Sequence, residues 1–329
     1  ACAGGVCVRP VPVGVVGVGA MGMNHLRVYD ALPAAELVEV VDPDPDRAAA
    51  IADAYDVTVH DTVDALETAE AVTVAVPNAA HRRVAVACLQ RGMDVLVEKP
   101  LATSVTDAEA IVAAARDADR ILQVGHIERF NPAVEVLTAL VDELEVFAVE
   151  AHRLGPFNEH LSSESVIHDL MVHDLDIITA LIPEPIDALS AMGIARRSPR
   201  LDHAVASLQF DSGIIAQLTA SHVTHGKVRT LAVTARDAYV TLDYQDQRLT
   251  IHRRGLEQTT TVEDRPGYRT ETVTETPYVQ TGEPLQRELA HLLKCVRTRE
   301  RPRVDGAAGL AAITLAERVM AEIDRGVGR

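Results

Sequence analysis

The sequence predicts an α/β protein whose parallel N-terminal sheet is followed by an α+β part with a mostly antiparallel, open sheet. Residues 12–127 alternate short β-branched runs with helical patterns, which is typical of a parallel sheet with helices on both faces. From about residue 186 to 276, strand follows strand with hairpin turns between them. The length of 329 residues also suits two domains.

The N-terminal apolar runs have the composition of strands buried on both faces. We expect strands at residues 12–18, 36–42, 71–77, 94–100 and 120–126. We expect helices at residues 21–32, 46–55, from the third strand through Arg91, and at 106–119 with Thr106 as N-cap. Residues 12–127 therefore form the first predicted domain, and the leader at 1–11 is expected to be disordered.

The remaining chain, residues 128–329, forms the second predicted domain. Its strands are expected at residues 145–153, 203–210, 213–223, 228–235, 238–244 and 247–254. Its helices are expected at residues 131–142, around 168–176, and at 283–298 and 306–325. The last two helices could pack back on the first domain.

Composition narrows the classes of partner. The net charge is −17, there is no Trp, and aromatic residues make up 3% of the chain, so neither a nucleic-acid backbone nor stacked bases are expected partners. Only Lys99, Lys227 and Lys294 are lysines among 31 basic residues. This acidic balance fits a protein kept soluble in high salt, or an ordinary acidic protein of a GC-rich genome; stability that rises with added salt would favour the first.

None of the four cysteines forms a CxxC pair with another, so a metal site built on cysteine is not expected. No stretch is long and apolar enough to cross a bilayer, and the N-terminus lacks the features of a signal peptide. We therefore expect a cytoplasmic protein with no membrane partner.

A GxGxxG motif at Gly17, Gly19 and Gly22 lies between the first predicted strand and helix, inside a βαβ unit. In this context it predicts a Rossmann dinucleotide site: a tight turn at Gly17, close backbone approach to the pyrophosphate at Gly19, and helix-on-strand packing at Gly22. The helix N-terminus, with Ala20 and Met21, would offer N–H donors to the phosphates. The alternative is a turn with purely structural glycines.

Asp42 ends the second predicted strand, about 20 residues after the last glycine, where an acidic residue binds the ribose 2′-hydroxyl. A carboxylate there disfavours a 2′-phosphate. No arginine follows immediately, and Arg47 is a helical turn away. We therefore expect NAD in preference to NADP.

The segment VEKPLA, residues 97–102, closes the fourth predicted strand at the sheet edge where ligands bind in open α/β folds. Lys99 could bond a sugar hydroxyl and change its acidity. Pro100 restrains Lys99 to extended geometry, and the bond between them could be cis. The alternative is a Glu–Lys pair at a strand end before a turn proline.

The segment HDLMVHDLD, residues 168–176, contains the second group of chemically active residues. On a helix, Asp169 and His173 share a face, and a carboxylate so placed can orient an imidazole for proton transfer. The alternative is a structural histidine beside a surface aspartate. A metal cage from His168, Asp169, His173 and Asp174 would need a loop instead of a helix, and a phosphohydrolase built on His173-Asp174 would need an all-helical fold. Neither is favoured, so no metal is expected.

The joint pattern of GVGAMG at 17–22, VEKPLA at 97–102 and D-x-x-x-H-D-x-D at 169–176 resembles the glucose–fructose oxidoreductase / inositol dehydrogenase family (Gfo/Idh/MocA). The late EPLQRELAHLL at 283–293 and the closing helix resemble it too. The resemblance implies an N-terminal Rossmann domain and a C-terminal domain that binds substrate. It also implies a homodimer or homotetramer formed through the C-terminal sheet.

The resemblance further implies a catalytic set of Lys99, Asp169 and His173. His173 would take the hydroxyl proton as hydride leaves the same carbon for nicotinamide, Lys99 would polarise that oxygen, and Asp169 would steer or assist. By the same analogy Pro77 and Asn78 lie near the nicotinamide ribose, and Glu98 and Lys99 contact the cofactor.

Two further segments, GHIERFNPAV at 125–134 and AHRLGPF at 151–157, resemble the branch that oxidises nucleotide-linked amino sugars such as UDP-N-acetylglucosamine at the 3-hydroxyl. Arg129, Asn131 and Arg153 could donate to a diphosphate or sugar. Alternatively, Arg129 is a domain-junction ion pair and Asn131 an N-cap before Pro132. Oxidation of a free sugar or inositol, and a non-catalytic NAD-binding regulator, stay open as other functions.

Overall fold

The computed structural model describes residues 9–157, 164–262 and 265–327. The expected disorder of the leader falls mostly on residues 1–8, which lie outside the described residues. The chain forms two compact units, Ala1–Phe130 with Glu283–Glu317, and Asn131–Gly282 with Arg318–Arg329. The segment Glu283–Glu317 thus belongs to the first unit, although it follows the second unit's sheet in sequence.

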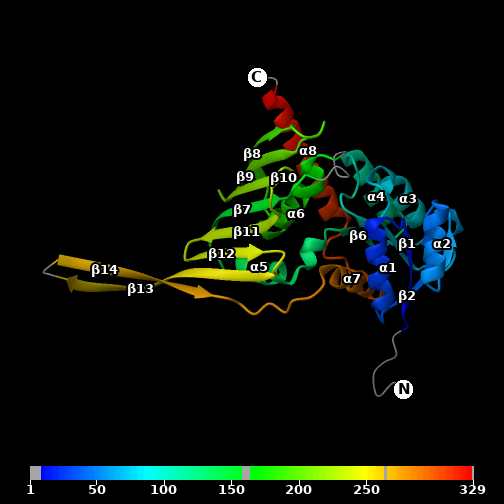
Figure 1. Ribbon diagram of the computed structural model, residues 1–329, viewed down its shortest axis with the longest axis horizontal. Helices are drawn as coiled ribbons and strands as arrows, with labels where there is room; N and C mark the ends of the chain where they lie inside the picture. The colour runs from blue at the N-terminus through cyan, green and yellow to red at the C-terminus, as the bar shows by residue number, and fades with distance from the viewer. Residues whose placement is uncertain (1–8, 158–163, 263–264, 328–329) are drawn as a thin grey trace, which may run out of the picture. The chain divides into compact units, whose positions relative to one another are not determined.

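The first unit is built on a six-stranded sheet in the order β3-β2-β1-β4-β5-β6, in which every pairing is parallel (Figure 1). Its strands are β1 (Val11–Val16), β2 (Ala35–Val41), β3 (Thr58–His60), β4 (Ala71–Val74), β5 (Asp94–Glu98) and β6 (Leu122–Gly125). All residues of β1, β4 and β5 are buried and most of them are apolar, as expected for strands with helices on both faces of the sheet. This confirms the predicted parallel N-terminal sheet.

The helices of the first unit begin and end close to their predicted positions. They are α1 (Ala20–Ala31), α2 (Pro45–Ala54), α3 (His81–Gln90), α4 (Val105–Asp117) and α7 (Pro284–Thr298), with short 3₁₀ turns at Val63–Ala65, Asn78–Ala80 and Ile127–Phe130. The predicted N-cap of α4 is wrong. Ser104, not Thr106, caps this helix, because its hydroxyl accepts the Asp107 N–H at 3.2 Å.

The second unit contains an eight-stranded sheet in the order β14-β13-β12-β11-β7-β10-β9-β8. Its strands are β7 (Val146–Leu154), β8 (Ile186–Ile194), β9 (His203–Phe210), β10 (Ile215–Ser221), β11 (Val228–Ala235), β12 (Ala238–Asp243), β13 (Arg248–Val262) and β14 (Arg265–Glu275). Only the pairing of β7 with β10 is parallel, which confirms a mostly antiparallel sheet. Beyond the edge of the sheet, β13 and β14 continue as a two-stranded ribbon (Figure 1).

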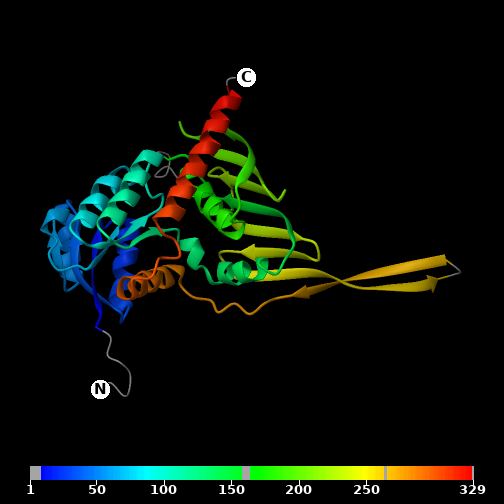
Figure 2. The same cartoon turned by 180° about the vertical axis from the view of Figure 1, so that it is seen from behind.

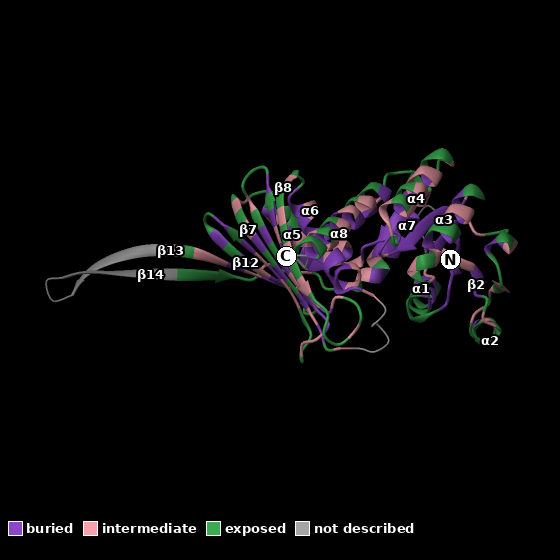
Figure 3. Ribbon diagram, turned by 90° about the horizontal axis from the view of Figure 1, so that it is seen from above, coloured by how far each residue is buried: buried purple, intermediate pink, exposed green. Residues whose placement is uncertain are grey.

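Helices cover one face of the second sheet. They are α5 (Pro132–Val141), the π-helical turn η5 (Ile167–Met171), α6 (Val172–Leu181) and the end of α8 (Gly306–Val327), which begins in the first unit. Figure 2 shows α5 and α6 against this face. Figure 3 shows the alternation of buried and exposed residues along the strands, which leaves the other face open. Within the described residues, no helix has both the length and the apolar character that a membrane crossing requires.

Candidate active site

The glycine motif forms a tight turn between β1 and α1. Gly17 has φ of 90°, a region that favours glycine. A Cβ atom on Gly22 would lie 1.9 Å from the carbonyl oxygen of Gly17, so only glycine lets the helix approach the strand this closely. A Cβ on Gly19 would meet nothing within 4 Å, so Gly19 faces open space. These three environments match the three roles that a dinucleotide turn requires.

The N-terminus of α1 is available to an anion. Its N-cap, Gly19, offers no side-chain cap, and its first turn contains no acidic residue. Ala20 and Met21 are exposed. A helix N-terminus with uncapped N–H groups and no competing carboxylate favours a phosphate, so the residues of this turn fit the pyrophosphate of a dinucleotide.

Asp42 lies just after β2 and is 4% exposed. Its Oδ2 accepts the Val18 N–H at 2.8 Å, which ties it to the glycine turn, and its Oδ1 accepts from Asp44 N and from the Arg47 guanidinium at 3.0 Å. Burial opposes ionisation, but these hydrogen bonds and the Arg47 charge outweigh it and hold the pKa of Asp42 below its usual value. Arg47, set aside because it is a helical turn away in sequence, therefore contacts Asp42 directly.

Lys99 follows β5 and is half-buried, and the peptide bond to Pro100 is cis. The preceding Glu98 is 8% exposed and accepts from His25 Nε2 at 2.6 Å and from the Lys99 N–H at 3.3 Å. His25 is fully buried on α1, one turn beyond Gly22. The imidazole of His25 thus connects the helix of the glycine turn to the strand end that carries Lys99.

A second buried histidine connects the loops after β4 and β5. His81 Nδ1 lies 2.9 Å from the carbonyl oxygen of Pro100, and its Nε2 lies 3.0 Å from that of Val76. Pro77 and Asn78, expected near the nicotinamide ribose, directly follow Val76. Burial lowers the pKa of His81, although the two carbonyl groups favour its protonated form. Sequence reasoning missed both His25 and His81, because their partners lie on other elements.

Glu288 is a buried acid of the same unit. It lies on α7 and is fully buried, and within the described residues neither carboxyl oxygen has a hydrogen-bond partner. Burial, and then the nearby charge of Glu98, raise the pKa of Glu288 well above its usual value. A neutral carboxylic acid at this position avoids placing a second negative charge beside Glu98.

In the second unit, the segment HDLMVHDLD is helical, but its first part has π-helical geometry. Asp169 lies in η5 and His173 in the first turn of α6, and both are half-buried. The wider π turn changes the spacing on which the predicted i, i+4 relation of the two residues depends. Such turns often occur at functional sites, because they redirect side chains without ending the helix.

Asp169 contacts a residue that the sequence did not suggest. Its Oδ2 lies 2.9 Å from Nε2 of His222, which directly follows β10 and is 8% exposed. The carboxylate and the imidazole are separated by 53 residues in sequence, so no local spacing could have paired them. A half-buried carboxylate held by an imidazole, one turn from a second histidine, is suited to move or stabilise a proton.

The three proposed substrate-binding residues have different environments. Arg153 is 3% exposed and donates to both carboxylate oxygens of Asp174, at 3.0 and 2.8 Å, with its guanidinium 4.9 Å from the Tyr244 ring centre. Asn131 is 2% exposed; it caps α5 through Ala133 N and donates to the Tyr244 carbonyl. Both residues therefore make contacts inside the second unit, and Asn131 forms the N-cap that the alternative predicted. Arg129 is half-buried at the end of the first unit.

Replacing Arg153 by leucine is expected to destabilise the protein by about 3–5 kcal/mol, because the buried Asp174 carboxylate would lose its partner. Urea unfolding measures this change, and Arg116→Leu is the control, because Arg116 forms an ion pair with Asp117 that is exposed on both sides. If Arg153→Leu has unchanged stability but a raised KM, Arg153 binds the substrate instead.

The contacts of Asp174 also bear on the metal-dependent alternatives. Its carboxylate is 2% exposed and taken up by Arg153, so the His173-Asp174 pair does not have the open carboxylate that a metal-dependent phosphohydrolase needs. Across residues 9–157, 164–262 and 265–327, no three His, Cys, Asp or Glu side chains group as metal ligands.

The candidate residues form two groups, one within each unit, and we call each group a half-site. Gly17, Asp42, Glu98 and Lys99 lie in the first unit, and Asp169 and His173 in the second. The first half-site fits a dinucleotide, and the second presents an acid–base group.

Two family models match the chain. Residues 11–126 match the oxidoreductase family with an NAD-binding Rossmann fold (GFO_IDH_MocA), and residues 145–252 match the GFO/IDH/MocA C-terminal domain. UDP-N-acetylglucosamine 3-dehydrogenase of Acidithiobacillus ferrooxidans is 31% identical over 94% of this chain and 96% of its own. The chain belongs to the Gfo/Idh/MocA oxidoreductase family. The family resemblance seen in the sequence is thereby confirmed.

Other Gfo/Idh/MocA members and structures are also similar. Inositol 2-dehydrogenase of Corynebacterium glutamicum is 34% identical, over 52% of this chain and 53% of its own. The solved structure of the Acidithiobacillus ferrooxidans enzyme superposes with a TM-score of 0.87 at 28% identity, covering 97% of this chain and 99% of that one. The chain is thus an oxidoreductase, and the relatives named above are dehydrogenases of UDP-N-acetylglucosamine and of inositol.

Proposed function

We propose that this protein oxidises a secondary hydroxyl of a nucleotide-linked sugar, with UDP-N-acetylglucosamine at its 3-hydroxyl as the substrate and NAD as the acceptor. The observation that carries the reaction is the contact of the half-buried Asp169 with the buried His222, one turn from His173. The relative from Acidithiobacillus ferrooxidans, similar over nearly the full length of both chains, supports the choice of substrate.

We assign the dinucleotide to the first unit and the sugar to the second. Bound NAD supplies an acceptor for hydride. His173 takes the hydroxyl proton, Lys99 stabilises the negative charge that grows on the oxygen, and Asp169, held by His222, stabilises the protonated imidazole. The links of His25 and His81 to the loops around Lys99 hold that part of the backbone in place.

A substrate panel with NAD separates the leading proposal from its alternatives. The inositol dehydrogenases that match about half of this chain favour a free sugar or inositol as the second candidate. Reduced-nicotinamide absorbance with UDP-N-acetylglucosamine, and not with inositol or free N-acetylglucosamine, is the expected result. Faster NAD reduction with inositol than with UDP-N-acetylglucosamine would make inositol the substrate instead. NAD binding without turnover of any sugar would favour the non-catalytic regulator.

The choice of NAD depends on Asp42, whose charge would oppose a 2′-phosphate. Replacing Asp42 by serine is expected to shift the ratio of kcat/KM for NAD over NADP toward NADP by at least about tenfold, because a like charge is removed and Arg47 is released to pair with the phosphate. The matched control is Asp46→Ser, since Asp46 is exposed in the first turn of α2. An unchanged ratio would show that Asp42 does not select the cofactor.

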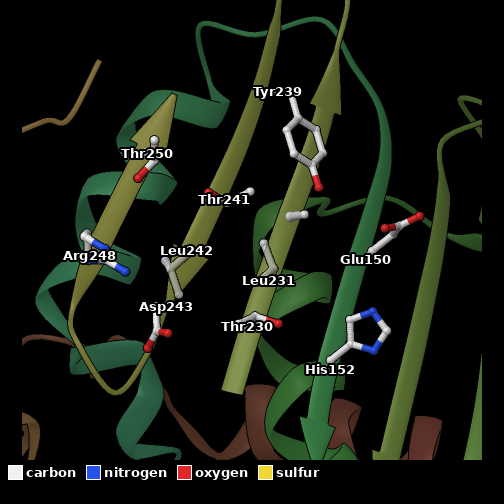
Figure 4. Close-up of a pocket in the computed structure, with 11 residues that line it drawn as sticks. Glu150, His152, Thr230, Leu231, Tyr239, Thr241, Leu242, Asp243, Arg248 and Thr250 are labelled. Atoms are coloured by element: carbon white, nitrogen blue, oxygen red, sulfur yellow. The ribbon is translucent and has the colours of Figure 1, made fainter. Parts of the chain in front are cut away.

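We also propose that the open face of the second sheet joins copies of the chain. It contains a shallow hollow, shown in Figure 4, with Glu150, His152 and Tyr239 among its lining residues. Tyr239 is 42% exposed, and Phe147 on β7 is 46% exposed. Sedimentation of the wild type should give a dimer or tetramer, and Tyr239→Asp should weaken it. A monomeric wild type at micromolar concentration would contradict this assembly.

A further inference from the structure

An arginine-rich loop connects β8 and β9 in the second unit. Its sequence is ARRSPRL, residues 195–201, in a chain whose net charge is −17. Arg196, Arg197 and Arg200 are exposed. Among the described residues, no carboxylate forms an ion pair with any of these three guanidinium groups. Figure 1 shows the two strands that the loop joins at the edge of the sheet.

A buried aspartate fixes the conformation of this loop. Asp202 is 1% exposed, and its Oδ2 accepts the N–H groups of Arg196 and Arg197, each at 2.6 Å, while its Oδ1 accepts the Ser198 hydroxyl at 2.8 Å. Burial opposes ionisation, but these hydrogen bonds outweigh it and hold the pKa of Asp202 below its usual value. Backbone and hydroxyl donors thus satisfy this carboxylate, so the three arginine side chains of the loop stay available to bind a ligand.

The end of the loop is hydrogen-bonded to both segments of the acid–base half-site. The Leu201 carbonyl accepts the N–H of Val166, directly before η5, at 2.9 Å. The Asp202 carbonyl accepts the N–H of His222 at 2.8 Å, and the His222 ring contacts Asp169. The loop is therefore anchored to the residues that hold the proposed catalytic carboxylate.

One arginine of the loop is held by an aromatic ring. The Arg197 guanidinium carbon lies 5.2 Å from the ring centre of Phe157, the last residue of the AHRLGPF segment. A guanidinium stacked on a ring keeps its N–H donors free at the edge, and its rotamer is already restricted. Less conformational entropy is then lost when the side chain binds a ligand.

We propose that the loop of residues 195–201 binds the diphosphate of the nucleotide-linked substrate whose sugar reaches Asp169 and His173. The inference rests on the proposed function and adds the group that recognises the nucleotide end. Guanidinium groups match phosphate oxygens with paired N–H donors, and an acidic protein needs such a local positive group to hold a dianion. An inositol or free sugar carries no phosphate and would make no use of the loop.

Calorimetry with UDP as the probe tests this directly. The triple variant Arg196→Ala, Arg197→Ala, Arg200→Ala is compared with a control triple variant, Arg116→Ala, Arg120→Ala, Arg325→Ala, which removes the same charge from exposed sites. We expect the loop variant to bind UDP about 10- to 100-fold more weakly than the wild type, and the control to bind as the wild type does. Because all six side chains are exposed, thermal unfolding should be the same for the three proteins.

Turnover gives a second readout. In the loop variant, KM for UDP-N-acetylglucosamine should rise by a similar factor, while kcat stays within about twofold, because the loop holds the nucleotide away from the reacting carbon. A wild type that binds no UDP, or a loop variant that binds it as tightly, overturns the proposal. Loop-dependent UDP binding by a protein that oxidises no sugar supports the loop and refutes the proposed reaction instead.

Discussion

Replacing Lys99 or His173 by alanine is expected to lower kcat by about 10²- to 10⁴-fold, the usual contribution of a positioned proton-transfer or charge-stabilising group. Lys99 is half-buried after β5, and His173 is half-buried in the first turn of α6, so neither side chain fills the core. Both variants should fold. Steady-state kinetics with UDP-N-acetylglucosamine, together with thermal unfolding, separate loss of chemistry from loss of structure.

Residues of the same type outside the proposed site supply the controls. Lys294 is an exposed lysine on α7 that pairs with Glu300, and His252 lies on β13 beside Thr274. Lys294→Ala and His252→Ala should retain activity within about twofold, as surface changes usually do. Full activity in Lys99→Ala and His173→Ala would mean that the catalytic set is wrong, even though the family assignment would stand.

Replacing Gly22 by alanine is expected to abolish dinucleotide binding and lower the melting temperature. The new Cβ would lie 1.9 Å from the Gly17 carbonyl oxygen, so the turn between β1 and α1 would have to move. Gly19→Ala has a different expected outcome. Its Cβ meets no protein atom within 4 Å, so stability should hold while the dinucleotide, which the backbone must approach closely here, binds at least about tenfold more weakly.

The contrast between the two glycine variants is the informative result. Calorimetric titration with NAD and a thermal melt measure both variants in the same way. If Gly19→Ala binds NAD as the wild type does, the open space at Gly19 is not where the pyrophosphate lies. If Gly22→Ala has the same melting temperature as the wild type, α1 can move away from Gly17 without loss of stability. The close approach of the two glycines would then not be required.

Local patterns predicted most of the fold because most strands of the first sheet contain a run of buried apolar residues and each helix follows a turn. The short β3 was missed, because three residues carry no readable periodicity. The strand predicted at residues 247–254 covers only the first part of β13, which begins at Arg248 and continues to Val262 as a ribbon with β14. Thr106 was predicted as the N-cap of α4 in place of Ser104, because a helix boundary is uncertain by a residue or two when several hydroxyl residues lie close together.

The candidate site was less accessible from sequence, because its hydrogen bonds join distant elements. Asp169 and His222 are 53 residues apart, and His25 and Glu98 are 73 apart, so no motif spacing links them. The segment AHRLGPF suggested Arg153 as a donor to the substrate, but it could not show that this arginine is buried. Arg153 forms an ion pair with Asp174 inside the second unit, 21 residues away in sequence.

The most direct test of the central claim follows the hydrogen that leaves the sugar. Purified protein is incubated with NAD and UDP-N-acetylglucosamine that carries deuterium on carbon 3. The mass of the reduced dinucleotide is then measured by mass spectrometry, and Lys99→Ala is measured in the same way for comparison. The account predicts reduced dinucleotide that carries the deuterium, and far less of it from the variant. Reduced dinucleotide without the label, or reduction with inositol alone, would contradict it.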